Sequence, residues 1–175
     1  EAATGLSHNP VIDRELSEDE VVCFFAGTLI DTEHGPVAIE NLTPGDLIWT
    51  KDDGFRPLRW IGSMTLTAEA LARSPHLCPI RIRASALAPN IPSRDLLVSP
   101  QHRILVSSKI AVKMFGAIEV LIPAKQLLQV EGIDYALDLH EVTYFHMLFD
   151  GHQIVGSNGA ETESLRLAAE AGVGQ

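Results

Sequence analysis

From Val21 onward the chain alternates short apolar segments with clusters of turn residues. Segments of this kind predict β-strands, and the glycine, proline and aspartate between them predict turns. Thr43-Pro44-Gly45-Asp46 has proline and glycine at the central positions of a type II turn, and Asp52-Asp53-Gly54 is a hairpin signal. The pattern therefore predicts a β-rich domain. Its expected strands are Val21–Phe25, Leu29–Thr32, Val37–Ile39, Asp46–Thr50, Arg56–Ile61, Pro79–Arg83, Leu96–Ser99, Arg103–Ser107, Glu119–Ile122, Val142–Phe149 and Gln153–Val155.

Three short segments predict helices instead. Thr67–Arg73 begins with a threonine N-cap and ends before a proline. Ala124–Leu128 is opened by a proline, which is common at the first turn of a helix. Glu161–Ala171 is the third predicted helix, with a glycine to stop it. The segment Ser85–Ser93 contains two prolines and is expected to be a loop.

The ends of the chain differ from its centre. Residues 1–20 lack a sustained hydrophobic period and are predicted to be a flanking linker. The domain is expected to span residues 21–165, followed by a tail, 166–175, into which the third helix would run. Because the chain starts at Glu1 without a methionine or an apolar leader, we expect it to be a trimmed or excised part of a longer protein.

A weak internal repeat is also visible. The stretch Gly35–Leu47 aligns loosely with Gly116–Leu127, and each follows a segment with a candidate catalytic residue, Cys23 in one half and His102 in the other. Chance similarity is the alternative explanation. A true repeat would predict two β-rich halves folded over each other, with the chemistry at their seam.

Composition narrows the class of protein. The chain has 175 residues, 46% of them hydrophobic, and a net charge of −10. It is long enough to bury a core, and its charge argues against binding a nucleic-acid backbone. No apolar run reaches the roughly 20 residues of a membrane span. The two cysteines make no disulfide framework, and without a Cys-x-x-Cys motif they do not suggest a structural zinc site. We expect a monomer without a cofactor.

The residues that can carry chemistry are few. A cysteine attacks only as its thiolate, and a nearby imidazole can take its proton and later return it. Cys23 at a strand–loop junction is the candidate nucleophile, and His102, His146 and His152 are the candidate acids and bases. Histidines in strands are more often structural than functional, so spacing alone leaves both interpretations open.

Three segments resemble the Hedgehog/intein (Hint) superfamily in the right order. Cys23-Phe-Phe-Ala-Gly-Thr-Leu-Ile-Asp-Thr32, followed by Gly45-Asp-Leu-Ile-Trp-Thr50, resembles the first sequence block of that superfamily. Ser99-Pro-Gln-His102 resembles its Thr-x-x-His block, and Tyr144–Gly159 its late block. The resemblance implies an all-β Hint fold of two pseudo-symmetric halves with short helices. The nearest likeness is to bacterial Hint-type domains, which occur in large and often secreted proteins; the sequence itself indicates no compartment.

The resemblance also implies an activity on the chain itself. In the family, the matching thiol attacks the carbonyl just before it, and the amide becomes a thioester. Here the scissile bond would join Val22 to Cys23, and His102 would protonate the departing nitrogen. Ser99 would bond the scissile peptide or steer His102. The N-terminal flank would be the substrate, and water or a small nucleophile would release it.

Three departures from the family limit this expectation. The His-Asn terminus on which inteins rely is replaced by Glu163-Ser164, so full splicing is not expected. His146 stands where the late block often has aspartate, and it could carry a proton for the cysteine. Ser99 replaces the threonine of the second block and lacks its methyl group. Asp150-Gly151-His152 lies where the late block carries a histidine, so this stretch would orient the site, or Asp150 would shape a turn.

Two further readings remain open from the sequence. One is a catalytically silent Hint-fold module that serves in assembly or binding within a larger protein. The other is a zinc site on Cys23, His102 and His146, which would require all three side chains within reach of one point and a fourth ligand. Cys78, with His76 close before it, is expected to be an ordinary core or surface thiol.

Overall fold

Two antiparallel β-sheets make up most of the computed structural model, which describes residues 22–107, 112, 113, 116 and 118–165. The first sheet has the order β11-β7-β8-β1-β12-β6 and the second the order β10-β9-β14-β13-β2-β4-β5, with β3 paired to β2. Strands of the first sheet are β1 (Phe24–Phe25), β6 (Trp60–Leu66), β7 (Ile80–Ile82), β8 (Leu96–Val98), β11 (Ile133–Tyr135) and β12 (Val142–Leu148). Strands of the second are β2 (Leu29–Thr32), β3 (Gly35–Ala38), β4 (Leu47–Thr50), β5 (Gly54–Pro57), β9 (Arg103–Ser107), β10 (Glu119–Pro123), β13 (Ile154–Ser157) and β14 (Ala160–Glu163). The helices are α2 (Ala68–Arg73), η2 (Ile39–Asn41), η3 (Pro75–Leu77) and η4 (Ala124–Leu127).

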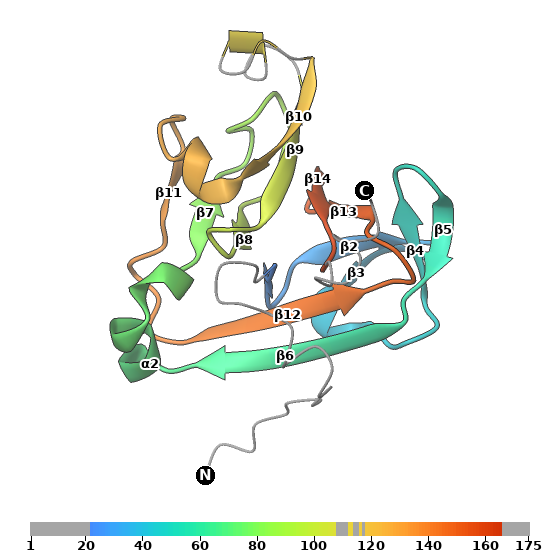
Figure 1. Ribbon diagram of the computed structural model, residues 1–175, viewed down its shortest axis with the longest axis horizontal. Helices are drawn as coiled ribbons and strands as arrows, with labels where there is room; N and C mark the ends of the chain where they lie inside the picture. The colour runs from blue at the N-terminus through green and yellow to red at the C-terminus, as the bar shows by residue number, and fades with distance from the viewer. Residues whose placement is uncertain (1–21, 108–111, 114–115, 117, 166–175) are drawn as a thin grey trace, which may run out of the picture.

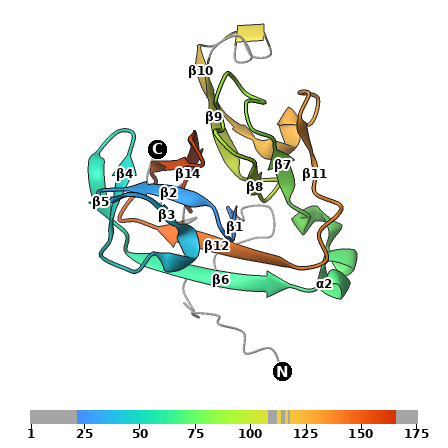
Figure 2. The same cartoon turned by 180° about the vertical axis from the view of Figure 1, so that it is seen from behind.

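The strands gather into two halves. Figures 1 and 2 show β7 to β11 on one side and β2 to β5 on the other, with the long strands β12 and β6 running beneath both. β1 lies between the halves, because it pairs with β8 through Phe24↔Val98 and with β12 through Phe24↔Phe145. The predicted all-β fold with two halves is confirmed. None of the helices in the described part of the chain is long and apolar enough to cross a membrane.

Equivalent hydrogen bonds relate the two halves. The Thr28 amide donates to the Phe25 carbonyl at 3.2 Å, and the His102 amide donates to the Ser99 carbonyl at 3.0 Å. Each turn is followed by a hairpin, β2–β3 or β9–β10, and then by a 3-10 helix whose first amide donates back to the Thr28 or His102 carbonyl. The repeat suspected in the sequence is therefore structural.

The register of that repeat differs from the sequence alignment. The back-donating amides belong to Ile39 and Ala124, so these two residues are equivalent. Aligning Gly35 with Gly116 would instead have paired Ile39 with Val120. Apolar residues recur in both stretches, which makes several alignments look alike until hydrogen bonds select one.

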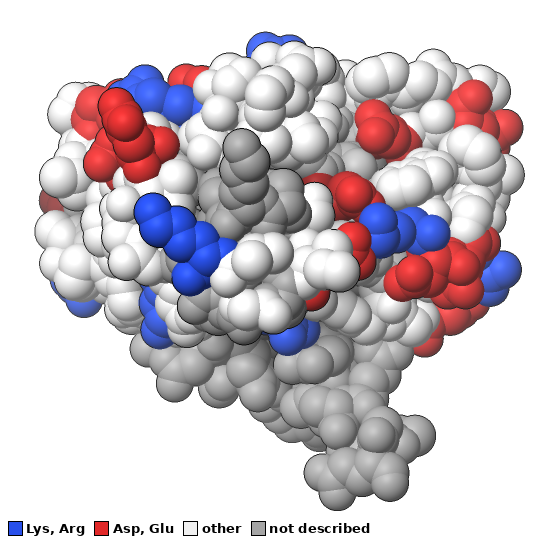
Figure 3. Space-filling model, turned by 90° about the horizontal axis from the view of Figure 1, so that it is seen from above, with Lys and Arg blue, Asp and Glu red and all other residues white. Residues whose placement is uncertain are grey.

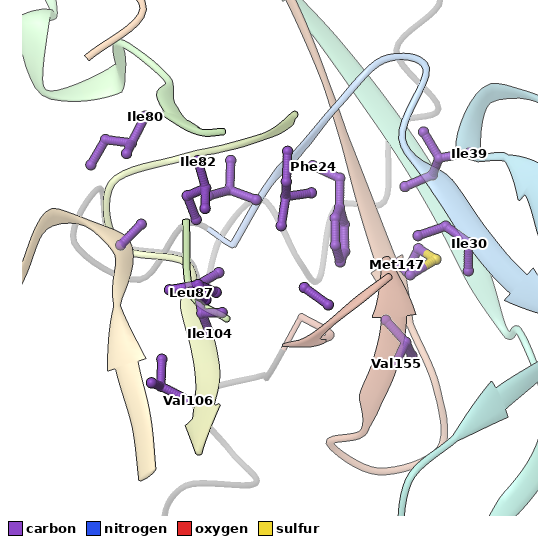
Figure 4. Packing of buried hydrophobic residues seen from close by; sticks show 14 of the residues in the cluster. Phe24, Ile30, Ile39, Ile80, Ile82, Leu87, Ile104, Val106, Met147 and Val155 are labelled. Atoms are coloured by element: carbon purple, nitrogen blue, oxygen red, sulfur yellow. The ribbon is translucent and has the colours of Figure 1, made fainter. Parts of the chain in front are cut away.

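The hydrophobic core fills the space where the halves meet. Phe24 is fully buried, and Figure 4 places its ring between Ile82 and Ile104 on one side and Ile30 and Met147 on the other. Burying large apolar side chains from both halves in one cluster joins them by the hydrophobic effect. The strand that carries the candidate nucleophile is thus fixed within the core.

One helix prediction is wrong. The segment expected to begin a C-terminal helix at Glu161 forms β14, which pairs with β13 from Ile154↔Glu163 to Ser157↔Ala160. The turn between them is Asn158-Gly159, with φ of 47° and 81°. Asn-Gly with both residues at positive φ is the strongest two-residue hairpin signal, and it overrides the helix propensity of the following residues. The rest of that prediction, together with the tail, lies outside the described residues.

Other elements differ in smaller ways. The strand predicted at Arg56–Ile61 is two strands, because β5 belongs to the second sheet and β6 to the first. The predicted helix at Ala124–Leu128 is the 3-10 helix η4, and the short strand β11 was not predicted. α2 forms as predicted, with the Thr67 hydroxyl accepting from the Ala70 amide at 3.2 Å. The local sequence cannot predict where the chain passes from one sheet to the other, because this point is defined only by the strands with which β5 and β6 pair.

The surface carries charges of both signs. On the face seen in Figure 3, basic side chains of the described residues lie beside acidic ones. Among the ion pairs are Arg81 with Asp138 at 3.0 Å and Lys51 with Glu161 at 3.0 Å. Exposed pairs of this kind contribute little to stability.

Candidate active site at the seam

The candidate nucleophile is held by Ser99 on both sides of its backbone. The Cys23 amide donates to the Ser99 hydroxyl oxygen at 3.0 Å, and the Ser99 amide donates to the Cys23 carbonyl oxygen at 3.1 Å. Both residues are buried. Cys23 immediately precedes β1, and Ser99 immediately follows β8, so the pairing of these strands brings the two residues together. The amide in contact with Ser99 is the nitrogen of the Val22–Cys23 peptide bond.

His146 reaches both reacting groups of that peptide. Its Nδ1 lies 3.3 Å from the Cys23 sulfur and 3.2 Å from the Val22 carbonyl oxygen, and its Nε2 lies 3.8 Å from the sulfur. Its neighbour Phe145 pairs with Phe24 in the β1–β12 ladder, which fixes the position of His146 beside the cysteine. One ring nitrogen therefore stands between the nucleophile and the carbonyl that it would attack.

His102 occupies a different position from the one expected. Its Nδ1 lies 2.9 Å from the carbonyl oxygen of Cys23, and its Nε2 lies 2.8 Å from the carbonyl oxygen of Glu163. The ring is fully buried and makes an edge contact with Phe24, with 4.4 Å between the ring centroids. His102 thus contacts the peptide bond after Cys23, whereas Ser99 contacts the nitrogen of the Val22–Cys23 peptide bond.

Burial opposes charge on both Cys23 and His102. It raises the pKa of the Cys23 thiol well above its ordinary value, and a hydrogen bond from Ser99 lowers it by less. Burial lowers the pKa of His102, against the opposing effects of the Glu163 carboxylate and the two backbone hydrogen bonds. A thiol of raised pKa is protonated at neutral pH, so it requires a neighbouring base before it can attack.

A buried carboxylate completes the site. The Glu163 side chain accepts from the Arg103 amide at 2.9 Å, from Arg103 Nε at 3.1 Å and Nη2 at 2.9 Å, and from His152 Nε2 at 2.9 Å. Sequence reasoning singled out Glu163 only as a replacement for a residue of the intein terminus. The Asn158-Gly159 hairpin signal could have placed Glu163 on a strand paired with β13, but not in contact with His152.

The remaining predicted residue lies at the surface. Asp150 accepts two hydrogen bonds from the Arg59 guanidinium, at 2.9 and 3.0 Å, and its side chain is 62% exposed. The structure therefore brings Cys23, Ser99, His102 and His146 together, connects His152 to them through Glu163, and places Asp150 in a separate ion pair.

Metal binding finds no support in this arrangement. In the part of the chain that the structure describes, no group of three or more histidine, cysteine, aspartate or glutamate side chains is placed to hold a metal ion. Both nitrogens of His102 face carbonyl oxygens, so neither is directed at a point shared with Cys23 and His146. The zinc reading of the sequence therefore lacks its ligand geometry.

The Glu163 ion pairs predict a loss of stability in acid. Burial alone would raise the pKa of Glu163, but hydrogen bonds from His152 and Arg103 outweigh it and lower this pKa from 4.5 to about 2. A depressed carboxylate pKa stabilises the fold fully above pH 4.5, and this contribution disappears as the pH falls through about 2. The linked free energy is about 3 kcal/mol. Urea unfolding between pH 6 and 2 should therefore give a difference in unfolding free energy between wild type and Glu163→Gln that shrinks as the pH falls.

A surface carboxylate provides the control for that measurement. Asp150→Asn removes an exposed acid, so its unfolding free energy should follow the wild-type pH dependence closely. A difference between wild type and Glu163→Gln that stays constant over this pH range would contradict the assignment.

The fold and the site together define a class: an all-β domain of two pseudo-symmetric halves that presents a buried cysteine to the peptide bond preceding it. The chain belongs to the Hint domain family, whose sequence profile matches residues 22–169. It is thus a Hint-type domain, of the self-processing class.

Solved structures with a similar fold are inteins and an intein-like domain. They include a splice-inactive, glutathione-linked variant of the AceL NrdHF class 3 split intein (14% identity, 82% of this chain and 97% of that one, TM-score 0.50). The gp41-1 intein covers 81% of this chain and 98% of its own, at 12% identity and a TM-score of 0.49. A bacterial intein-like domain from Clostridium thermocellum covers 82% and 98%, at 16% identity and a TM-score of 0.47. No curated protein matches the sequence. At these identities the likeness concerns the fold alone.

Proposed function

We propose that this domain cleaves its own chain at the Val22–Cys23 bond through an N-to-S acyl shift, and that it does not splice. The observation that supports this most directly is the position of His146 Nδ1, within 3.3 Å of the Cys23 sulfur and 3.2 Å of the Val22 carbonyl oxygen. Acyl transfer requires a base at hydrogen-bond distance from the nucleophile and a donor to the developing oxyanion, and Nδ1 can supply the second once it has taken the thiol proton.

The first step is attack by sulfur. Neutral His146 takes the thiol proton on Nδ1, and the thiolate forms a bond to the Val22 carbonyl carbon. The electron pair of the carbonyl double bond moves to its oxygen. The protonated Nδ1 then donates to that oxyanion, which the same nitrogen already approaches in the resting state. His146 therefore serves first as base and then as oxyanion donor.

The second step breaks the amide. The carbon–nitrogen bond cleaves as the oxyanion reforms the carbonyl, and the electron pair left on the Cys23 nitrogen takes up a proton. Overall, the thiol proton ends on this nitrogen, so His146 returns what it removed. Ser99 holds the nitrogen at 3.0 Å, and its hydroxyl can turn from accepting to donating as the nitrogen gains a lone pair. This assignment gives Ser99 and His146 the task that the sequence assigned to His102, which instead anchors the next peptide.

The last step releases the flank. Water or another small nucleophile attacks the thioester carbonyl of Val22, and the Cys23 thiol is restored. Residues 1–22 leave as a separate peptide. A second cut by the intein route has no support, because Glu163 and Ser164 stand where that route needs histidine and asparagine. The Glu163 carboxylate is moreover held in an ion pair with Arg103.

Intact mass over time tests the proposal. The full chain, incubated at pH 7 with dithiothreitol or hydroxylamine, should lose residues 1–22, and hydroxylamine should leave a hydroxamate on Val22, which only an activated acyl group forms. Cys23→Ala should remain whole, because it lacks the nucleophile.

The second cysteine provides a matched control. Cys78 lies beside the Pro79 and Ala136 carbonyls and has no part in the proposed chemistry, so Cys78→Ala should cleave at the wild-type rate. Loss of the flank from Cys23→Ala would indicate an outside protease. A wild-type chain that stays intact with both reagents would refute self-cleavage and favour the silent Hint-fold module.

A further inference from the structure

Glu163 connects the site to the surface of the domain. Its backbone contacts His102, and its side chain contacts two residues that are partly exposed. Its carbonyl oxygen lies 2.8 Å from His102 Nε2, and its carboxylate is bound by Arg103 and His152. The carboxylate is only 3% exposed, whereas the side chains of Arg103 and His152 are 29% and 25% exposed. The residue therefore links two partly exposed side chains, a guanidinium and an imidazole, to a histidine that is wholly buried.

Arg103 fixes the carboxylate with several bonds at once. Its backbone amide, its Nε and its Nη2 all donate to Glu163 within 3.1 Å. A guanidinium and a backbone amide on one carboxylate leave it little freedom, because each bond restricts a different direction. The β14–β9 pairing holds the adjacent residue of the same strand, through Thr162↔Ile104. The carbonyl of Glu163 is thereby fixed along with its side chain.

The His102 ring needs that fixed carbonyl. Its two nitrogens face two oxygens, of Cys23 and of Glu163, at 2.9 and 2.8 Å. A ring held at both ends cannot turn about its axis without losing both bonds, whereas a ring held only by the Cys23 carbonyl could pivot on its contact with Phe24. The Cys23 peptide is held by His102 and Ser99 together, so a loosened ring would loosen the nucleophile.

We propose that Glu163 is a positioning residue for cleavage: its carboxylate, clamped by Arg103 and His152, sets its own carbonyl on His102 Nε2 and so fixes His102 on the Cys23 carbonyl. The inference rests on the proposed self-cleavage and adds a residue that touches none of the reacting atoms.

Glu163→Gln tests the positioning role with little change of size. In full-length chain, cleavage in hydroxylamine should slow by about 10-fold to 100-fold, the usual result of losing the group that orients a functional histidine. Arg103→Lys keeps the charge and the backbone amide but loses the forked guanidinium contact with the carboxylate. Its rate of cleavage should therefore lie between those of the wild type and Glu163→Gln. Arg59→Lys is the matched control, since Arg59 makes the same kind of fork on Asp150 at the surface, and it should cleave at the wild-type rate.

A spectroscopic arm reports on His102 directly and does not depend on cleavage. In the Cys23→Ala background, nitrogen-15 NMR should place the His102 Nε2 resonance at a different position in Glu163→Gln than in the parent, with faster exchange of its proton. Circular dichroism checks that each variant is folded. Unchanged His102 resonances in folded Glu163→Gln would overturn the inference, and so would cleavage as fast as that of Arg59→Lys. If the wild type never cleaves but Glu163→Gln still changes the His102 resonances, the proposed function is refuted, while the positioning of His102 by Glu163 stands.

Discussion

We expect His146→Ala to lower the rate of cleavage at Val22–Cys23 by about 10³-fold, within the range that a positioned general base contributes. Burial raises the pKa of the Cys23 thiol above its ordinary value of 9.0, so thiolate is scarce at pH 7 unless a neighbour removes the proton. His146 Nδ1 is 3.3 Å from that sulfur. The same substitution removes the nitrogen 3.2 Å from the Val22 carbonyl oxygen, which would donate to the oxyanion once it is protonated, so base and oxyanion contact are lost together.

The rate of cleavage is measured by intact mass in hydroxylamine, and two further variants serve as comparisons. His34→Ala removes an imidazole that is 83% exposed and remote from the seam, and it should cleave at the wild-type rate. His102→Ala should also be slow, because the anchor of the Cys23 carbonyl is gone, yet less so than His146→Ala. A larger loss in His102→Ala than in His146→Ala would restore the role of principal proton carrier to His102, as the sequence suggested.

Phe24→Ala should lower the free energy of unfolding by about 3 to 5 kcal/mol, the cost of emptying a large site in a packed core. Its ring is fully buried between the halves, and its backbone belongs to the strand that pairs with both β8 and β12. The neighbouring structure can collapse only slightly around the gap, because three strands are hydrogen-bonded there. Urea unfolding with an unchanged slope against denaturant concentration would measure this loss.

Phe55→Ala is the matched control, because it makes the same substitution at an exposed position. Phe55 lies on β5 and is 50% exposed, so its removal should cost less than about 1 kcal/mol. Equal losses from Phe24→Ala and Phe55→Ala would show that the halves are not joined through a tightly packed seam.

Most strands could be predicted because their signals are local. Leu29–Thr32 and Arg103–Ser107 form strands with the predicted bounds, since an apolar pattern of period two and flanking turn residues are properties of the segment itself. The hairpin at Asp52-Asp53-Gly54 joins β4 and β5 as predicted. The helix predicted from Glu161 is wrong, because the Asn158-Gly159 turn pairs the following residues with β13 and outweighs their helix propensity.

The site could be predicted only in part. Cys23, Ser99 and His102 belong to short segments whose order along the chain carries the family resemblance, and the structure brings all three to the seam. No local sequence signal predicts which atoms of these three residues contact one another. The pairing of β1 with β8 decides that the nitrogen of the Val22–Cys23 peptide faces Ser99 and not His102. Glu163 entered the site through β14, an element that the sequence reasoning had assigned as helix.

By itself, the sequence determined the class of fold, because hydrophobic period and turn chemistry are local properties. The order of its motifs also singled out Cys23 and the Val22–Cys23 bond as the proposed site. The tertiary structure alone decided that the His146 ring meets the Cys23 sulfur, whereas both nitrogens of the His102 ring meet carbonyl oxygens. His146 and Cys23 are 123 residues apart in the chain, and Glu163 and His102 are 61 apart. Contacts at such separations arise from strand partners and register, and no local pattern encodes these.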